Sequence, residues 1–137
     1  MNAQPSPDLD AALVLGMAST AIPFASSREQ EAERWLRILR LHGEAGIALQ
    51  ALGVSEAPLE HDSEHHEHPV APNGEDVVGR VVDAAVASAS RRHAPCFGTS
   101  DVLVAVIDVY GNDFSHVLRA HGTDRDEVLE RIELLAA

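Results

Sequence analysis

The sequence has a single cysteine, few aromatic residues and no long apolar run, and each scarcity excludes a class of protein. One cysteine rules out a disulfide within the chain. No apolar segment approaches the roughly 18 residues that a transmembrane helix needs, and residues 1–7 lack the basic and apolar regions of a signal peptide. We therefore expect a cytoplasmic protein with no membrane partner.

Positive charge is also scarce, and so are the motifs of catalysis. The chain has 10 Lys and Arg against 22 Asp and Glu, a formal net charge of −12. So acidic a protein repels nucleic acid, which we do not expect as a partner. The phosphate-binding motif G-x-x-x-x-G-K-[ST] is absent, and no catalytic triad or pair of acid–base carboxylates stands out. We expect no enzyme, no catalytic residue and no cofactor.

Aliphatic residues at helical spacing make up much of what is present. Hydrophobic residues are 45% of the chain and only 4% of residues are aromatic, which favours an all-α fold of one compact domain over residues 1–137. The clearest amphipathic helix is expected over 75–92, with others over about 8–19, 27–41, 45–52 and in 98–122. Thr123 is expected to cap the last helix. In the helix expected over about 8–19, four residues share the apolar face: Leu9, Ala12, Leu13 and Met17.

The chain also repeats itself. A shift of 67 residues places Val14 on Val81 and Leu36 on Leu103, and a shift of 69 places Gly53 on Gly122. A duplicated helical unit is physically reasonable, because each copy covers the apolar face of the other. We therefore predict two pseudo-symmetric repeats of the four-helix type, residues 1–54 and 75–137, joined by an acidic, histidine-rich linker over 55–74.

Each half resembles the repeat of the Clp N-terminal domain, the helical module that precedes the ATPase rings of Clp-family protein unfoldases. That repeat reads as an amphipathic helix, G-T-E-H, an aliphatic helix, a glycine break and a helix that ends A-L-G-V. The second half has Gly98-Thr99 and the break, and the first half ends Leu52-Gly53-Val54. Since no ATPase motif accompanies the resemblance, we expect a stand-alone module.

The resemblance implies non-catalytic binding of peptides or proteins. The chain would act as an adaptor or a decoy for Clp-dependent proteolysis. Its partners would be a Clp ATPase, the adaptors or substrates of that ATPase, or peptidic small molecules. Some Gram-positive members also recognise arginine-phosphorylated proteins, through the motif glutamate and a threonine at the start of each repeat.

This sequence departs from the phosphoarginine pattern. Glu33 and Thr99 match motif positions, but the starting threonines fall on Asp8 and Glu75. Additional carboxylates repel a phosphate group, so recognition of phosphoarginine is not expected. Glu33 and Asp101 are then interpreted as ordinary carboxylates at helix starts.

The predicted binding site is the groove between the repeats, near the start of the second helix of each. Arginine side chains there can meet ligand carboxylates, and apolar side chains can cover the rest of a peptide. The residues assigned to this site are Glu33, Arg34, Arg37, Arg91, Arg92, Thr99, Ser100 and Asp101.

The linker suggests an alternative function. His61, His65 and His68 lie at spacings that suit zinc or nickel if the segment is helical, and histidines also titrate near a pKa of about 6.5. A metal- or pH-responsive protein is therefore one alternative, and a solvated linker is the simpler interpretation of the same residues.

Two further residues have a structural and a functional interpretation. Trp35 lies on the apolar face of the helix expected over 27–41, and we expect it to pack in the core. Its alternative role is an anchor that binds a partner. Cys96 lies close to His93 and two arginines, so a thiolate nucleophile would make the chain an accessory protein or an unrecognised enzyme. A small buried apolar residue is the role that we expect for Cys96.

Overall fold

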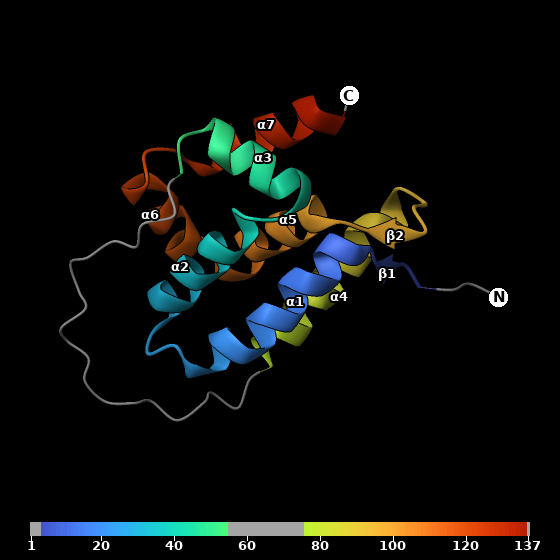
Figure 1. The fold of residues 1–137 in the computed structure, drawn as a ribbon, viewed down its shortest axis with the longest axis horizontal. Helices are drawn as coiled ribbons and strands as arrows, with labels where there is room; N and C mark the ends of the chain where they lie inside the picture. Colours follow the sequence, from blue (N-terminus) through green and yellow to red (C-terminus); the bar gives the residue numbers. More distant parts are fainter. Residues whose placement is uncertain (1–3, 55–75, 137) are drawn as a thin grey trace.

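The computed structural model describes residues 4–54 and 76–136, and these ranges are mostly helical (Figure 1). The all-α prediction is therefore confirmed for the described part of the chain. None of its helices is long and apolar enough to cross a membrane. The elements, in chain order, are β1 (Ser6–Pro7), α1 (Leu9–Ala21), the 3-10 helix η1 (Ile22–Phe24), α2 (Arg28–Leu39), α3 (Gly43–Ala51), α4 (Val77–Arg91), β2 (Cys96–Phe97), α5 (Thr99–Tyr110), α6 (Asn112–Ala120) and α7 (Arg125–Ala136).

Helix α5 lies at the centre of the fold. Eight of its twelve residues are buried, and the helix contacts each of the other six α-helices of the described chain. Its aliphatic residues point in nearly every direction, which is the pattern of a helix enclosed by others. In Figure 1 the other helices surround α5, with α1 and α4 side by side below it and α3 and α7 above it.

Side-chain caps set the beginnings of the helices. The carboxylate of Asp8 accepts a hydrogen bond from the Ala11 amide at 2.9 Å and begins α1, and the hydroxyl of Ser27 accepts from the Gln30 amide at 3.0 Å and begins α2. The side-chain oxygen of Gln30 accepts from the amide of Ser26, one residue before the expected Ser27. These caps place both helix starts where the sequence predicted them.

The last helix begins differently from the prediction. Asp124, not Thr123, is the capping residue, because its carboxylate accepts from the Glu127 amide at 2.9 Å. The amide of Thr123 already bonds to the carbonyl of Leu118, and its buried hydroxyl donates to the Glu127 carboxylate at 2.7 Å. Thr123 therefore completes the turn after α6 and leaves the cap to the next residue.

Trp35 lies in the core, as predicted, and it ties the two halves of the chain together. Its side chain is fully buried, and Nε1 donates to the hydroxyl of Tyr110 at 3.0 Å. That hydroxyl donates in turn to the Glu31 carboxylate at 2.7 Å, while the Arg28 guanidinium lies 4.8 Å from the centre of the Tyr110 ring. Helices α2 and α5 are thus joined by polar contacts as well as by packing.

Helix α1 presents the predicted apolar face to solvent. Leu9, Leu13 and Met17 are 76%, 48% and 42% exposed, whereas Ala11 and Ala18 on the opposite side are fully buried. Because α1 is apolar around its whole circumference, spacing alone could not decide which side packs inward. The side with small residues allows the closer approach to the neighbouring helices α2, α4 and α5.

The prediction that Cys96 is buried is wrong. Cys96 is exposed on β2, while the next residue, Phe97, is 1% exposed, as the alternation of side chains along a strand requires. Strand β2 pairs in parallel with β1, and the amide of Asp8 bonds to the carbonyl of Phe97 at 2.9 Å. This two-stranded sheet, which the sequence did not predict, brings the start of α1 beside the start of α5.

Candidate functional site

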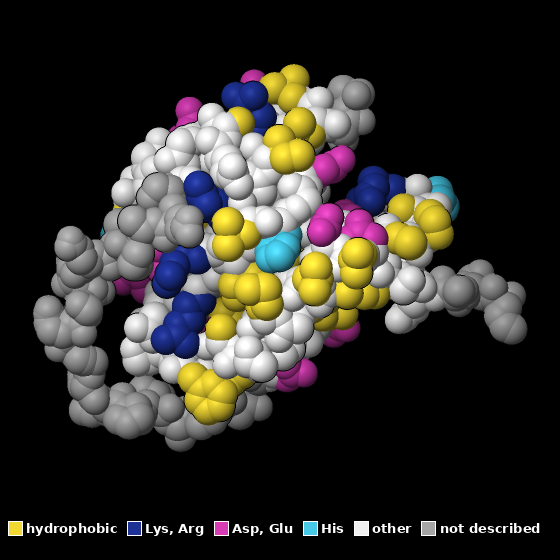
Figure 2. Space-filling view, in the orientation of Figure 1, with side chains coloured by type: hydrophobic (Ala, Val, Ile, Leu, Met, Phe, Trp, Pro, Cys, Tyr) yellow, Lys and Arg dark blue, Asp and Glu magenta, His cyan; other side chains and the backbone are white. Residues whose placement is uncertain are grey.

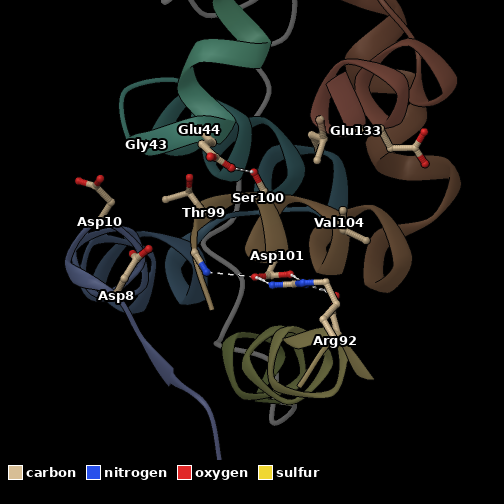
Figure 3. Close-up of a pocket in the computed structure, with 13 residues that line it drawn as sticks. Asp8, Asp10, Gly43, Glu44, Arg92, Thr99, Ser100, Asp101, Val104 and Glu133 are labelled. Atoms are coloured by element: carbon tan, nitrogen blue, oxygen red, sulfur yellow. Dashed lines mark hydrogen bonds and ion pairs between the residues drawn. The ribbon is translucent and has the colours of Figure 1, made fainter. Parts of the chain in front are cut away.

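A cleft of about 620 Å³ lies where the beginnings of α1, α3 and α5 meet the end of α4 and one face of α7 (Figure 3). Three helix starts therefore open onto one space, and they come from both halves of the chain. The residues that line the cleft are Asp8, Asp10, Gly43, Glu44, Ser88, Arg92, Gly98, Thr99, Ser100, Asp101, Val104, Ile132 and Glu133.

Asp101 is the most heavily bonded carboxylate of the cleft. It is 7% exposed and accepts two bonds from the Arg92 guanidinium, at 2.5 and 3.1 Å. It also accepts from the amide of Gly98 at 3.1 Å, which caps α5, and from the hydroxyl of Ser88 at 3.2 Å. The hydrogen bond and the charge of Asp101 raise the pKa of Arg92 above its ordinary value. Arg92 is therefore already neutralised by a protein partner.

Thr99 and Ser100 connect α5 to α3. The hydroxyl of Thr99, which is 3% exposed, accepts a hydrogen bond from the amide of Ala45 at 3.0 Å, and the hydroxyl of Ser100 donates to Glu44 at 3.2 Å. Gly43 has φ +62°, and a Cβ atom at this position would lie 2.5 Å from the Thr99 hydroxyl oxygen. Glycine is thus required here on two counts, conformation and space.

Carboxylates surround the cleft. Figure 3 shows Asp8 and Asp10 on one side, Glu44 above and Glu133 on the opposite side, with the pair of Asp101 and Arg92 at the base. The five carboxylates and one guanidinium among the lining residues carry a formal charge of −4. Because several carboxylates share one concave space, the cleft favours a positively charged ligand group over an anion.

The structure brings half of the predicted binding residues together. Arg92, Thr99, Ser100 and Asp101 all line the cleft. Arg91 lies next to them in the sequence but is exposed and outside the lining. A cleft therefore lies near the start of the second helix of the second half, and ligand binding at that place stays a prediction.

The remaining predicted residues lie on α2, away from the cleft. Arg34 donates to the carbonyl of Ala21 at 2.6 Å and so closes the end of α1, while Arg37 is exposed. Glu33 lies 2.9 Å from Nε2 of His121, and both side chains are largely buried, with 14% and 4% exposed. The interpretation as a helix-start carboxylate therefore holds for Asp101 and is wrong for Glu33, which lies within α2 and joins it to the end of α6.

The predicted binding site left out five lining residues with acidic or hydroxyl side chains: Asp8, Asp10, Glu44, Ser88 and Glu133. Asp10 and Glu44 lie in the first turns of α1 and α3, so acidic residues at helix starts were an available signal. Glu133 and Ser88 lie within α7 and α4 and reach the cleft only through the packing of those helices. The sequence carries no local mark for residues of that kind.

The predicted metal residues His61, His65 and His68 lie outside the described residues. Within 4–54 and 76–136, no group of three or more His, Cys, Asp or Glu side chains is placed to hold a metal ion. No model of a known protein family matches the chain, and no curated protein matches it either.

Proposed function

We propose that this chain is a non-catalytic peptide- or protein-binding module built like a Clp N-terminal domain, whose cleft takes a positively charged group of the ligand. The observation that carries the proposal is the cleft between the halves, which four carboxylate residues other than Asp101 line and where the lining arginine is already paired. In the cell such a module would act as an adaptor or a decoy in Clp-dependent proteolysis.

Equivalent positions of the two halves support the repeat on which this proposal depends. The bounds of α2 and α5 are offset by 71 residues, so Leu36 and Leu103, which a shift of 67 residues aligns, lie about one helical turn apart in these helices, and both are fully buried. Gly53 and Gly122 have φ of +88° and +91°, and each is followed by an amide that bonds five residues back at 3.0 Å, from Val54 to Leu49 and from Thr123 to Leu118. Two helices that end in the same way at aligned positions are expected of a duplicated unit.

The packing between the halves is also reciprocal. Helix α2 packs on α6, and α5, the counterpart of α2, packs on α3, the counterpart of α6. The beginnings of these helices meet through Arg28 and Asp113 at 3.0 Å on one side, and through Thr99 and Ala45 at 3.0 Å on the other. Two-fold related copies would exchange contacts in this manner.

The charge of the cleft favours a basic ligand over a phosphorylated one. Asp8, which takes the place of the starting threonine of the family, lines the cleft together with Asp10 and Glu44. These carboxylates would attract a guanidinium or ammonium group and repel a phosphate attached to it. The ligand class that we propose is therefore an unmodified arginine- or lysine-containing segment.

Calorimetric titration with matched peptides tests this preference. Two peptides of identical sequence, one with two arginines and one with two citrullines, differ only in charge at those side chains. We expect the arginine peptide to bind about tenfold more tightly, roughly 1.4 kcal/mol, and a phosphoarginine version to bind more weakly than the arginine peptide. Equal binding of the arginine and citrulline peptides, or binding of neither, would refute a cation-selective cleft.

A pair of variants links that binding to the cleft. Neutralising two exposed lining residues, Asp10→Asn with Glu44→Gln, should remove most of the preference for arginine. Asp108→Asn is the matched control, because Asp108 is an exposed carboxylate of α5 that does not line the cleft. If the control weakens binding as much as the double variant, the overall negative charge attracts the peptide and the cleft does not.

The Clp part of the proposal has its own test. Purified chain added to a Clp ATPase–protease reaction should change the rate at which a model substrate is degraded, upward for an adaptor and downward for a decoy. An unchanged rate over a wide excess of the chain would leave a peptide-binding protein without a role in Clp proteolysis.

A further inference from the structure

The outer side of α1 is apolar, exposed and free of charge over most of its length. Leu9, Leu13 and Met17 follow one another at intervals of four residues, and the exposed residues Ala12 and Gly16 lie beside them. We call these five residues the outer face of α1. Figure 2 shows a band of apolar side chains over α1. From residue 11 to residue 21 the helix contains no charged residue.

The largest exposed side chains of α1 are apolar, unlike those of an ordinary surface helix. The fully buried residues are Ala11, Val14 and Ala18, while the larger Leu9, Leu13 and Met17 face solvent. A helix that is apolar on all sides is normally covered on all sides, and contiguous exposed apolar residues mark interaction surfaces. The outer face of α1 therefore has the composition of a contact surface.

Gly16 gives a second, independent sign of a contact. A glycine in the middle of a helix costs stability relative to alanine, and a Cβ atom at Gly16 would meet nothing within 4 Å in the described chain. No contact within the described fold thus requires the glycine. A neighbouring helix that approaches closely would require it, as small residues do at helix–helix contacts.

The two ends of the outer face carry opposite charge. Asp8 and Asp10 lie at the beginning of α1, and Arg34, bonded to the carbonyl of Ala21, lies at its end, with Arg37 one turn further along α2. In Figure 2 acidic side chains lie at the end of the apolar band where α1 begins, and basic side chains lie over α2 beside its other end. From the beginning of α1 to its end, the surface is thus first acidic, then apolar and then basic.

We infer that the outer face of α1 binds the same face of a second copy of this chain, with the two helices antiparallel about a two-fold axis. Such a contact is self-complementary: the acidic end of each copy meets the basic end of the other, and the leucines meet in between. Gly16 lies near the middle of the thirteen-residue helix, where the two helices would approach most closely.

The size of the face sets the strength of this association. A helix of thirteen residues is about 20 Å long, so the contact buries less than the roughly 1,200 Å² of a standard interface. Each copy also carries a net charge of −12, which opposes association. We therefore expect a weak dimer that dissociates on dilution.

Sedimentation velocity over a concentration series, at one fixed salt concentration, tests the association. The sedimentation coefficient of the unaltered chain should rise with concentration toward that of a dimer, and Leu13→Lys should stay monomeric. Leu134→Lys, in another exposed leucine, which lies on α7, is the matched control and should dimerise like the unaltered chain. Both leucines are exposed, so circular dichroism should show unchanged helix content. A monomer at every concentration, or a dimer that Leu13→Lys leaves intact, would overturn the inference.

A charge exchange tests the antiparallel arrangement. Asp10→Arg and Arg37→Glu should each weaken the dimer, because each variant places like charges at both ends of its own contact. An equal mixture of the two variants should recover the affinity of the unaltered chain, since the mixed dimer has opposite charges at both ends. A mixture that associates no better than either variant alone would refute the two-fold geometry.

Discussion

The hydroxyl of Tyr110 is held between Nε1 of Trp35, which donates to it at 3.0 Å, and the carboxylate of Glu31, which accepts from it at 2.7 Å. Burial and the hydrogen bond to Glu31 raise the pKa of Tyr110 well above its ordinary value, because ionisation would place a phenolate in a buried site beside a carboxylate. The donor group of Trp35 acts in the opposite direction but more weakly.

Tyr110 is the only tyrosine of the chain, so its ionisation can be measured directly by the ultraviolet absorbance of tyrosinate. In the folded protein we expect no ionisation until well above pH 10, and in denaturant we expect a midpoint near the ordinary value of about 10. Glu31→Gln should lower the midpoint of the folded protein toward the ordinary value. A folded midpoint equal to that in denaturant would show that the hydroxyl is not held as described.

The same shift predicts how stability depends on alkaline pH. Below about pH 10 the tyrosine is protonated in both the folded and the unfolded state, and it contributes no dependence on pH. Above that pH the unfolded chain loses the proton while the folded chain keeps it, so the free energy of unfolding falls as pH rises. The greatest slope that one such group can give is about 1.4 kcal/mol per pH unit.

Single residues differ in how far the sequence revealed their roles. The burial of Trp35 followed from its place among Leu36 and Leu39, and Asp101 was predicted at a helix start, where its carboxylate accepts from the Gly98 amide. The pair of Glu33 and His121 could not be predicted, because 88 residues separate them and no local pattern marks either one. Neighbouring residues in the sequence decide which residues cap helices and which lie in the core. The packing of distant segments decides which carboxylates meet a partner.

Among the elements, α1 and the end of α3 show that replacing a glycine can change stability in opposite directions. Gly16 lies within α1, where nothing in the described chain needs it, whereas Gly53 follows α3 with φ +88°. Gly16→Ala should therefore raise the free energy of unfolding by about 0.5–1 kcal/mol, because alanine loses less conformational entropy in a helix. Gly53→Ala should lower it by about 1 kcal/mol or more, because a Cβ atom is strained at that φ.

Chemical denaturation in dilute solution, where the chain is monomeric, measures both changes. The slope of the transition should be the same for the two variants and the unaltered chain, so that the midpoints report stability alone. If Gly16→Ala proved destabilising, Gly16 would have a role within the monomer, and the argument from this glycine for a close helix–helix contact would fail.

Helix positions were predictable, but their orientation was not always so. Serine, aspartate and glycine mark the ends of α1, α2 and α3 because they satisfy backbone groups locally, which sequence reasoning can read. Helix α1 is apolar on every side, so periodicity could not say which side packs inward. The sheet of β1 and β2 was missed because strands of two residues are too short to carry a pattern.

At the scale of the whole molecule, the core belongs to both halves at once. Helix α5 of the second half contacts α1, α2 and α3 of the first, and one continuous cluster of buried side chains runs through both. The composition of the chain indicated a mostly helical fold, whereas the repeat that the shifted alignment suggested stays a prediction. The acidic character of the cleft was not predictable, because its carboxylates come from residues spread between Asp8 and Glu133.

A shared core predicts that neither half unfolds by itself. Leu36→Ala and Leu103→Ala remove fully buried side chains from α2 and α5, and each should lower the free energy of unfolding by about 2–5 kcal/mol. The fluorescence of Trp35, which reports on the first half, and the far-ultraviolet circular dichroism of all helices should then shift together in both variants. Each half exposes an apolar face without the other, so a cavity in one half destabilises the whole cluster.

A Leu103→Ala variant in which the dichroism transition moves while the Trp35 transition stays in place would show two independent units. The reciprocal packing of α2, α3, α5 and α6 would then not couple the halves.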